Sequence, residues 1–187
     1  TYLPIFIKNL NNMACALTIG RKIPCKSAFG GIKEVLFADF GGLTAVTVDS
    51  STKQVTAVTG TATWYKYDVK GPSSLETTVT SSRDNGTTFY TQTINLTLTF
   101  LDAKTQAELQ ILALGRPYAA VVDYYGNTFL CGFENGMEVT TGTVVSGAAA
   151  GDLSGFTMVL EGMEETAPYF VDSGVITAEA GQVDPTA

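Results

Sequence analysis

Residues that commonly carry out acid–base, nucleophilic or metal chemistry are few in this chain, and histidine is absent from its 187 residues. Ser-His-Asp catalysis, Cys-His catalysis and histidine-ligated zinc are therefore excluded. Glu164 and Glu165 are adjacent acids, but neighbours on a strand point to opposite faces of a sheet, so they do not form a catalytic carboxylate pair. We predict that the chain is not an enzyme and has no catalytic residue, metal site or cofactor.

The three cysteines, Cys15, Cys25 and Cys131, form no redox or zinc pattern, because no CxxC spacing occurs. An odd number of cysteines in a chain long enough to bury a core predicts reduced thiols. A disulfide between Cys15 and Cys25 is the alternative that the sequence leaves open. Phosphate-binding and calcium-binding loop patterns do not occur either.

Charge is unevenly distributed along the chain, whose net charge is −7. All 11 Lys and Arg residues occur at or before Arg116, and residues 117–187 contain 10 acids and no base. One explanation is a solvated acidic face. The other is that the basic part of one copy contacts the acidic part of the next, or that an acidic wall repels a polyanion. With three arginines and no basic cluster, the sequence does not predict a surface that grips nucleic acid.

Threonine and glycine are abundant, with 27 and 19 residues, which is typical of an all-β protein. The clearest strand is 93–100, where Ile94, Leu96, Leu98 and Phe100 alternate with polar residues and predict one buried face. Turn signals separate the other expected strands. These strands are 34–40, 43–48, 54–58, 61–69, 75–81, 118–124, 128–133, 137–145, 154–162, 169–171 and 175–177.

One segment, about residues 102–114, predicts a helix. Asp102 is a good N-cap, and Gly115 stands where a left-handed C-cap is common. Ala107, Ile111 and Leu114, joined by Leu112, form the apolar stripe that we expect to pack on the sheet. No 20–50-residue repeat is visible, and no apolar run approaches the length of a membrane span.

The two ends and two loops are the expected assembly elements. Residues 1–12 lack the pattern of a secretory signal and are either an extension upstream of a start at Met13 or an assembly arm. Residues 173–187 are acidic, and they are either disordered in isolation or an arm that orders on a neighbour. The candidate assembly loops contain Arg83, Asp84, Asn85 and Gly86 in a polar segment, and Gly147, Gly151 and Asp152 in a small-residue segment.

Several short sequence stretches, taken in their order along the chain, form a pattern that can be compared with known families. They are MAC (13–15), GRKIPCK (20–26), GGIK (30–33), WYKY (64–67), SSRDNGTTF (81–89), LALGRP (112–117), GTVVSGAAAGDLSG (142–155) and LEGME (160–164). Over residues 13 to about 172 the chain resembles virion structural proteins of tailed bacteriophages, of the tail-tube and tube-ring type. None of these stretches encodes chemistry, so the resemblance carries over no catalytic residue.

The resemblance implies a β-barrel or β-sandwich at residues 13–172, with one flanking helix and with residues 1–12 and 173–187 as extended terminal arms. It also implies that subunits close into a ring, usually a hexamer, and that rings stack into a hollow tube. That tube conducts double-stranded DNA without binding it specifically. Other tail or connector proteins are the further partners, the host bacterial cytoplasm is the site of synthesis, and the virion tail is the final location.

An acidic lumen suits such a tube, because phosphate then meets like charge. From the strands of the acidic half we choose Glu138 and Glu161 as candidate lumen acids. A long tube, a single connector ring and a baseplate-proximal piece are equally compatible with the sequence. The alternative from another class is a capsid-decoration, fibre or lectin-like module that binds a surface.

Overall fold

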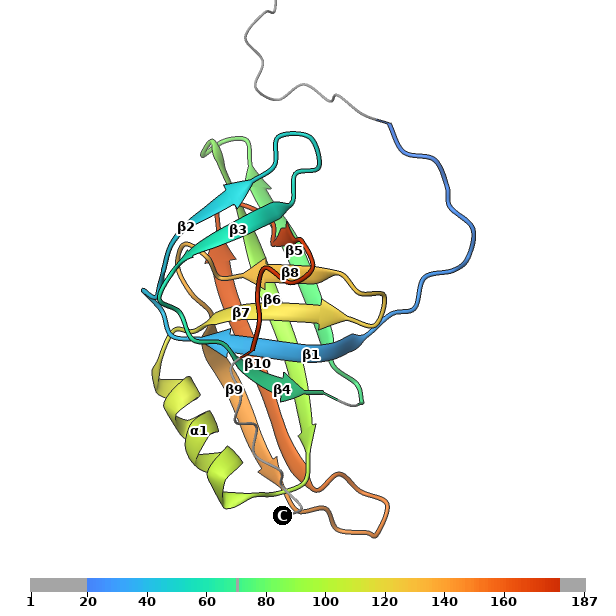
Figure 1. Cartoon of the computed structure of the whole chain (residues 1–187). Coiled ribbons are helices and arrows are strands. Elements are labelled where there is room, and N and C mark those ends of the chain that lie inside the picture. The colour runs from blue at the N-terminus through green and yellow to red at the C-terminus, as the bar shows by residue number, and fades with distance from the viewer. Residues whose placement is uncertain (1–19, 70, 179–187) are drawn as a thin grey trace, which may run out of the picture.

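The computed structural model describes residues 20–69 and 71–178 (Figure 1). Over these residues the chain forms eleven strands and one helix, so the mainly β prediction is confirmed. In chain order the elements are β1 (Ile32–Ala38), β2 (Leu43–Val48), β3 (Val55–Gly60), β4 (Tyr65–Asp68), β5 (Ser74–Ser82), β6 (Thr87–Thr99), α1 (Ala103–Leu114), β7 (Tyr118–Asp123), β8 (Thr128–Cys131), β9 (Glu138–Val145), β10 (Gly155–Glu164) and β11 (Tyr169–Val171).

The strands form two sheets that pack face to face. The large sheet has seven strands in the order β2-β3-β11-β8-β7-β1-β4, and the small sheet has four in the order β5-β6-β10-β9. Every pairing is antiparallel except that of β11 with β3. Figure 1 shows the long strands of the small sheet crossing behind β1 and β7 at a steep angle. Both sheets keep free edges, so the architecture is a β-sandwich and not a closed barrel.

The first hydrophobic core lies between the sheets. Alternate residues of β6, Ile94, Leu96 and Leu98, point inward beside Met158 and Leu160 of β10, and all five are buried. Thr and Asn occupy the intervening positions of β6, so the alternation in the sequence fixes which face of this strand is buried.

A second core lies on the other face of the large sheet. Leu36 and Ala38 of β1 and Tyr118 and Ala120 of β7 are buried there, together with Trp64. The large sheet therefore buries both of its faces, which explains why these strands read as continuous apolar runs without alternation.

The helix begins as predicted but ends differently. The Asp102 carboxylate accepts the backbone N–H of Thr105 at 2.9 Å, so the predicted N-cap is confirmed. Gly115 is extended, with φ −99° and ψ −175°, so the predicted left-handed C-cap is wrong. The chain continues directly toward β7, and an extended residue at this point serves that path.

The predicted packing face of α1 is wrong for Ala107, Ile111 and Leu114 and right for Leu112. Leu109 is buried and Leu112 packs against the first core, whereas Ile111 is 63% exposed and Leu114 is 90% exposed. Ala107 is exposed as well. The helix carries apolar residues on two sides, and only its tertiary position decides which side touches the sandwich.

The strands lie near their predicted positions, with four clear differences. The strand predicted at 61–69 forms only at Tyr65–Asp68. β6 begins at Thr87, six residues before the prediction, and it ends at Thr99. Phe100 was predicted to point inward, but it has φ +67° and is 59% exposed, because the chain turns outward there toward α1. Residues 175–177 form no strand, although Val175 and Ile176 pack against the second core.

Candidate assembly surfaces

The two predicted lumen acids lie opposite each other. Glu138 on β9 is the cross-strand partner of Glu161 on β10, and both side chains are exposed. Glu161 also pairs with Thr93 on β6, and Thr93 pairs with Glu76 on β5. Because the adjacent Leu160 points into the core, this row lies on the opposite side of the small sheet, which we call the outer face. Three carboxylates therefore lie along one line across four strands.

The outer face otherwise carries mainly hydroxyl and amide groups, together with the apolar side chains of Phe89, Val159 and Met163. None of the four strands of the small sheet contains Lys or Arg. Some of the polar groups bond to each other: the Asn95 amide donates to the Ser74 hydroxyl at 3.2 Å, and the Thr143 and Thr157 hydroxyls share a hydrogen bond. The neutral polar side chains on this face are Ser74, Thr78, Thr80, Thr91, Thr93, Asn95, Thr97, Thr141, Thr143 and Thr157.

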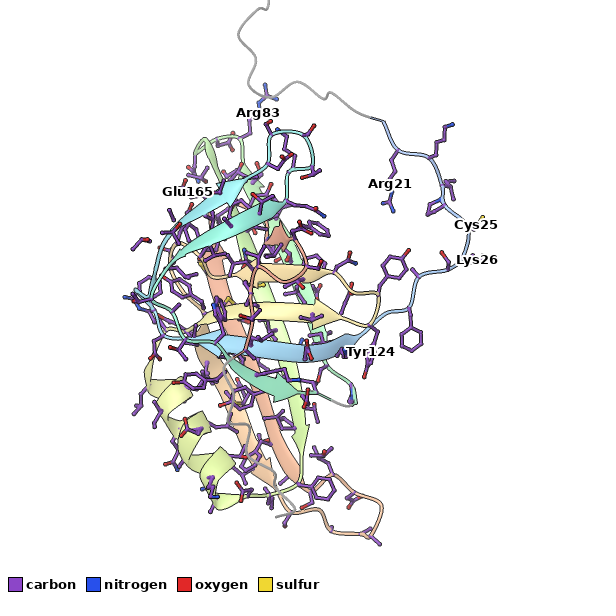
Figure 2. All side chains as sticks on the ribbon, in the orientation of Figure 1. Arg21, Cys25, Lys26, Arg83, Tyr124 and Glu165 are labelled. Carbon is purple, nitrogen blue, oxygen red and sulfur yellow. The ribbon has the colours of Figure 1, made fainter. Side chains whose placement is uncertain are left out.

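The polar candidate loop is the turn between β5 and β6. Arg83, Asp84, Asn85 and Gly86 are all exposed, and Gly86 adopts φ +65°. The backbone N–H of Asn85 donates to the Ser82 hydroxyl at 3.3 Å, which closes the turn. Figure 2 places Arg83 at the tip of this turn, pointing away from the sandwich.

The small-residue candidate loop connects β9 to β10. The Asp152 carboxylate accepts the backbone N–H groups of Ala149 at 2.8 Å and Ala148 at 2.9 Å. These two bonds lower the pKa of Asp152. Gly147 has φ +75°, and a side chain on Gly151 would meet open space. In Figure 1 this loop and the β5–β6 turn project from opposite ends of the small sheet, so the structure does not bring the two loops together.

An extended arm, residues 20–31, precedes β1. All of its residues are exposed, and it forms no helix or strand. Figures 1 and 2 show it leaving the sandwich, with Arg21, Cys25 and Lys26 along its length. At its root the rings of Phe29 and Tyr124 meet edge to face, with centroids 5.3 Å apart. The arm carries three cations, Arg21, Lys22 and Lys26, and no acid.

A groove of about 750 Å³ lies between α1 and the ends of β1 and β4, and we call it the α1–β4 groove. Its apolar lining includes Phe37, Tyr65, Phe100, Ile111 and Leu112. Among residues 20–69 and 71–178, β4 is the last strand of the large sheet, so one edge of this groove is a strand edge without a sheet neighbour in that part of the chain.

Charged residues of both signs also line the α1–β4 groove. Lys66 lies 3.2 Å from an Asp68 carboxylate oxygen, and its pKa is raised chiefly by the hydrogen bond to that carboxylate. The Arg116 guanidinium lies 4.7 Å from the centre of the Phe40 ring. Asp39 and Glu108 add two further acids to the lining.

A buried carboxylate, which sequence reasoning missed, holds the turn between β8 and β9. Glu164 ends β10 and accepts the backbone N–H groups of Asn135 at 2.9 Å and Glu134 at 3.0 Å. Burial raises the pKa of Glu164, and these two hydrogen bonds oppose the shift. The buried Gln92 has a similar role, since its side-chain oxygen accepts the backbone N–H of Gly132 at 3.0 Å. These groups satisfy backbone donors within the fold.

The described cysteines are both reduced. Cys25 is exposed on the arm, whereas Cys131 is buried and its pKa is raised by burial. Cys15 lies outside the described residues, so the alternative Cys15–Cys25 disulfide is not tested.

The described part of the chain contains no group of three His, Cys, Asp or Glu residues that could hold a metal ion. A helix long and apolar enough to span a membrane is likewise not found there.

Comparisons with known proteins identify no relative. No family model matches the chain, and neither a curated protein nor a solved structure matches it.

Proposed function

We propose that this protein is a structural subunit of the tail of a tailed bacteriophage. Copies assemble into a hexameric ring. The rings either stack into a hollow tube or form a single connector, and DNA passes through the central channel. The outer face of the small sheet lines the lumen. This face is the observation that carries the proposal, since it presents Glu76, Glu138 and Glu161 among mainly hydroxyl-bearing side chains, with no cation on its four strands.

Such a face suits a passage for DNA on electrostatic grounds. Proteins that hold DNA do so mainly through Lys and Arg, which neutralise phosphates and release counterions. A wall without cations cannot neutralise phosphates or release their counterions in this way, and its carboxylates repel phosphate at short range. The hydroxyl groups keep the wall hydrated. DNA is therefore neither gripped nor read on this surface.

The free sheet edges support side-by-side assembly. β5 and β9 are the two outer strands of the small sheet, and within the described part of the chain each has one edge without a sheet neighbour. Strand edges of this kind readily pair with another chain. Copies joined at these edges would place their outer faces next to one another and extend one continuous wall. The role is structural, and it assigns no catalytic step.

Negative-stain electron microscopy of the purified full chain, combined with light scattering after size exclusion, tests the proposal. Rings or short tubes with a stained central hole are the expected result. A chain that stays monomeric at all concentrations, or forms particles without a hole, would contradict it. Particles without a hole would instead favour the capsid-decoration, fibre or lectin-like alternative.

A further inference from the structure

The α1–β4 groove exposes apolar side chains on both of its walls. Tyr65 of β4 is 55% exposed, and Ile111 on α1 and Phe100 just before it are exposed to a similar degree. The edge of β4 offers backbone N–H and C=O groups to an added strand. A groove with a strand edge and apolar walls is suited to an extended peptide whose side chains alternate between the walls and solvent.

The arm has the complementary features. It is already extended, and Ile23, its large apolar residue beyond the root, is 97% exposed. Its three cations are complementary in charge to three acids of the groove lining, Asp39, Asp68 and Glu108. The lining cations, Lys66 and Arg116, lie against Asp68 and the Phe40 ring.

The other segments of this chain that could enter the groove match it less well. Residues 179–187 contain two acids, no base, and Val183 as their one large apolar residue. Residues 1–19 are apolar near their start but carry a single cation, Lys8. Charge therefore favours residues 20–31.

The arm and the groove of one copy lie at opposite ends of β1. The arm joins β1 before Ile32, whereas Phe37, near the end of β1, lines the groove. The separation along the strand is roughly 20 Å at ~3.3 Å per residue. The arm leads away from the sandwich in Figure 1, and its extended length of roughly 40 Å can reach a neighbouring copy. Gly30 and Gly31 precede the strand, and Gly31 has φ +108°, so the arm joins the body through a glycine pair.

We infer that residues 20–31 of one copy dock in the α1–β4 groove of a second copy, with Ile23 covering the groove's exposed apolar walls. The inference rests on the proposed self-assembly and names the contact that joins two subunits. It requires no change in the sandwich, because both partners are already exposed.

Disulfide trapping tests the contact directly. All chains carry Cys15→Ser, and the native Cys25 serves as the arm probe while Cys131 is buried. A full-length chain with Cys25 is mixed with a larger, tagged chain carrying Cys25→Ser and Ile111→Cys, and the mixture is mildly oxidised. We expect a mixed dimer on a non-reducing gel, at least tenfold stronger than with Leu114→Cys in place of Ile111→Cys. Leu114 is a matched control, since it is exposed on the same helix but does not line the groove.

The outcomes separate this inference from the proposed function. Equal trapping at positions 111 and 114 overturns the inference, even if rings form. Trapping without rings supports the arm contact and contradicts the ring proposal. An intrachain disulfide in a chain with both Cys25 and Ile111→Cys, without dimers, overturns the assignment to a second copy. Loss of trapping on deletion of residues 1–12 shows that the preceding segment makes the contact, and it also overturns the inference.

Charge insertion provides a second measurement, by mass photometry over a concentration series. Ile23→Asp and Ile111→Asp should each raise the concentration for half-assembly at least tenfold. Leu114→Asp should change it less than twofold, because Leu114 is 90% exposed on the same helix but does not line the groove. Equal effects of Ile111→Asp and Leu114→Asp would contradict the groove assignment.

Discussion

Glu138 of β9 and Glu161 of β10 face each other as a cross-strand pair on the outer face of the small sheet. Like charges in directly opposite positions destabilise a sheet. The pair therefore lowers the stability of the sandwich. Its role must lie in the interactions of the outer face with other molecules.

Replacing one member of this pair should stabilise the sandwich. In Glu138→Lys, repulsion across the pair becomes attraction, and we expect a gain of about 0.2–1 kcal/mol in the free energy of unfolding. Urea unfolding of the monomer at low salt measures it, and the gain should shrink at 1 M salt because the pair is exposed. A loss of stability would show that the two carboxylates do not repel each other.

DNA retention tests the lumen assignment. The unmodified assembly should not retain double-stranded DNA even at low salt, whereas Glu161→Lys should create retention that falls as salt rises. Glu165→Lys is the control, because it changes the charge equally but lies beyond the end of β10. Tight DNA binding by the unmodified assembly would contradict an acidic lumen, and equal retention by the two variants would place Glu161 elsewhere.

The two sides of α1 should respond differently to truncation. Leu109→Ala removes buried contacts in the first core and should cost about 2–5 kcal/mol, as should Leu98→Ala. Ile111→Ala should change the stability of the monomer by less than about 0.5 kcal/mol, because this side chain is mostly exposed. Chemical denaturation of the three variants checks the assignment. A large loss at Ile111 would mean that α1 packs through its other side.

Compared with Glu164→Gln, the native chain should gain in free energy of unfolding as the pH is lowered, because Gln does not titrate. The pKa of Glu164 is raised in the folded state. At pH values between the unfolded and the folded pKa, the Glu164 carboxylate therefore takes up a proton when the chain folds. Its contribution is therefore largest below about pH 4, and it falls as pH rises through the folded pKa. The measurement is the free energy of unfolding of the native chain minus that of Glu164→Gln at several pH values.

This difference should increase as pH falls from 7 toward 4. Asp49, Asp102 and Asp152 have lowered pKa values and act in the opposite direction, but they are common to both proteins and cancel. A difference that is independent of pH would show that Glu164 titrates as in an unfolded chain.

The carboxyl-terminal segment should divide into two parts on truncation. Deleting residues 173–187 removes Val175 and Ile176 from the second core, and we expect a loss of about 1–3 kcal/mol in the monomer. Deleting residues 179–187 keeps Val175 and Ile176 in place, so the shorter truncation should retain the stability that these two side chains supply. Thermal unfolding of the two truncations distinguishes them. Equal stability would show that Val175 and Ile176 contribute nothing to the core.

The sequence alone determined the features that depend on local pattern. Period-two alternation in β6 and β10 predicts their buried faces, because successive side chains of a strand must point to opposite sides. Asp102 predicts the start of α1, because its carboxylate reaches a backbone N–H three residues along the chain. The absence of histidine excludes whole classes of chemistry without any structure.

Only the tertiary structure decided the features that join distant segments. Glu76 meets the row of Glu161 and Glu138 through the register of four strands, which no local pattern in the sequence specifies. Glu164 looks like a surface acid until the turn between β8 and β9 closes over it. The buried side of α1 depends on where the helix meets the sandwich, since both of its sides carry apolar residues. In each case the energy comes from contacts between residues far apart in the chain, and the fold must form before those contacts exist.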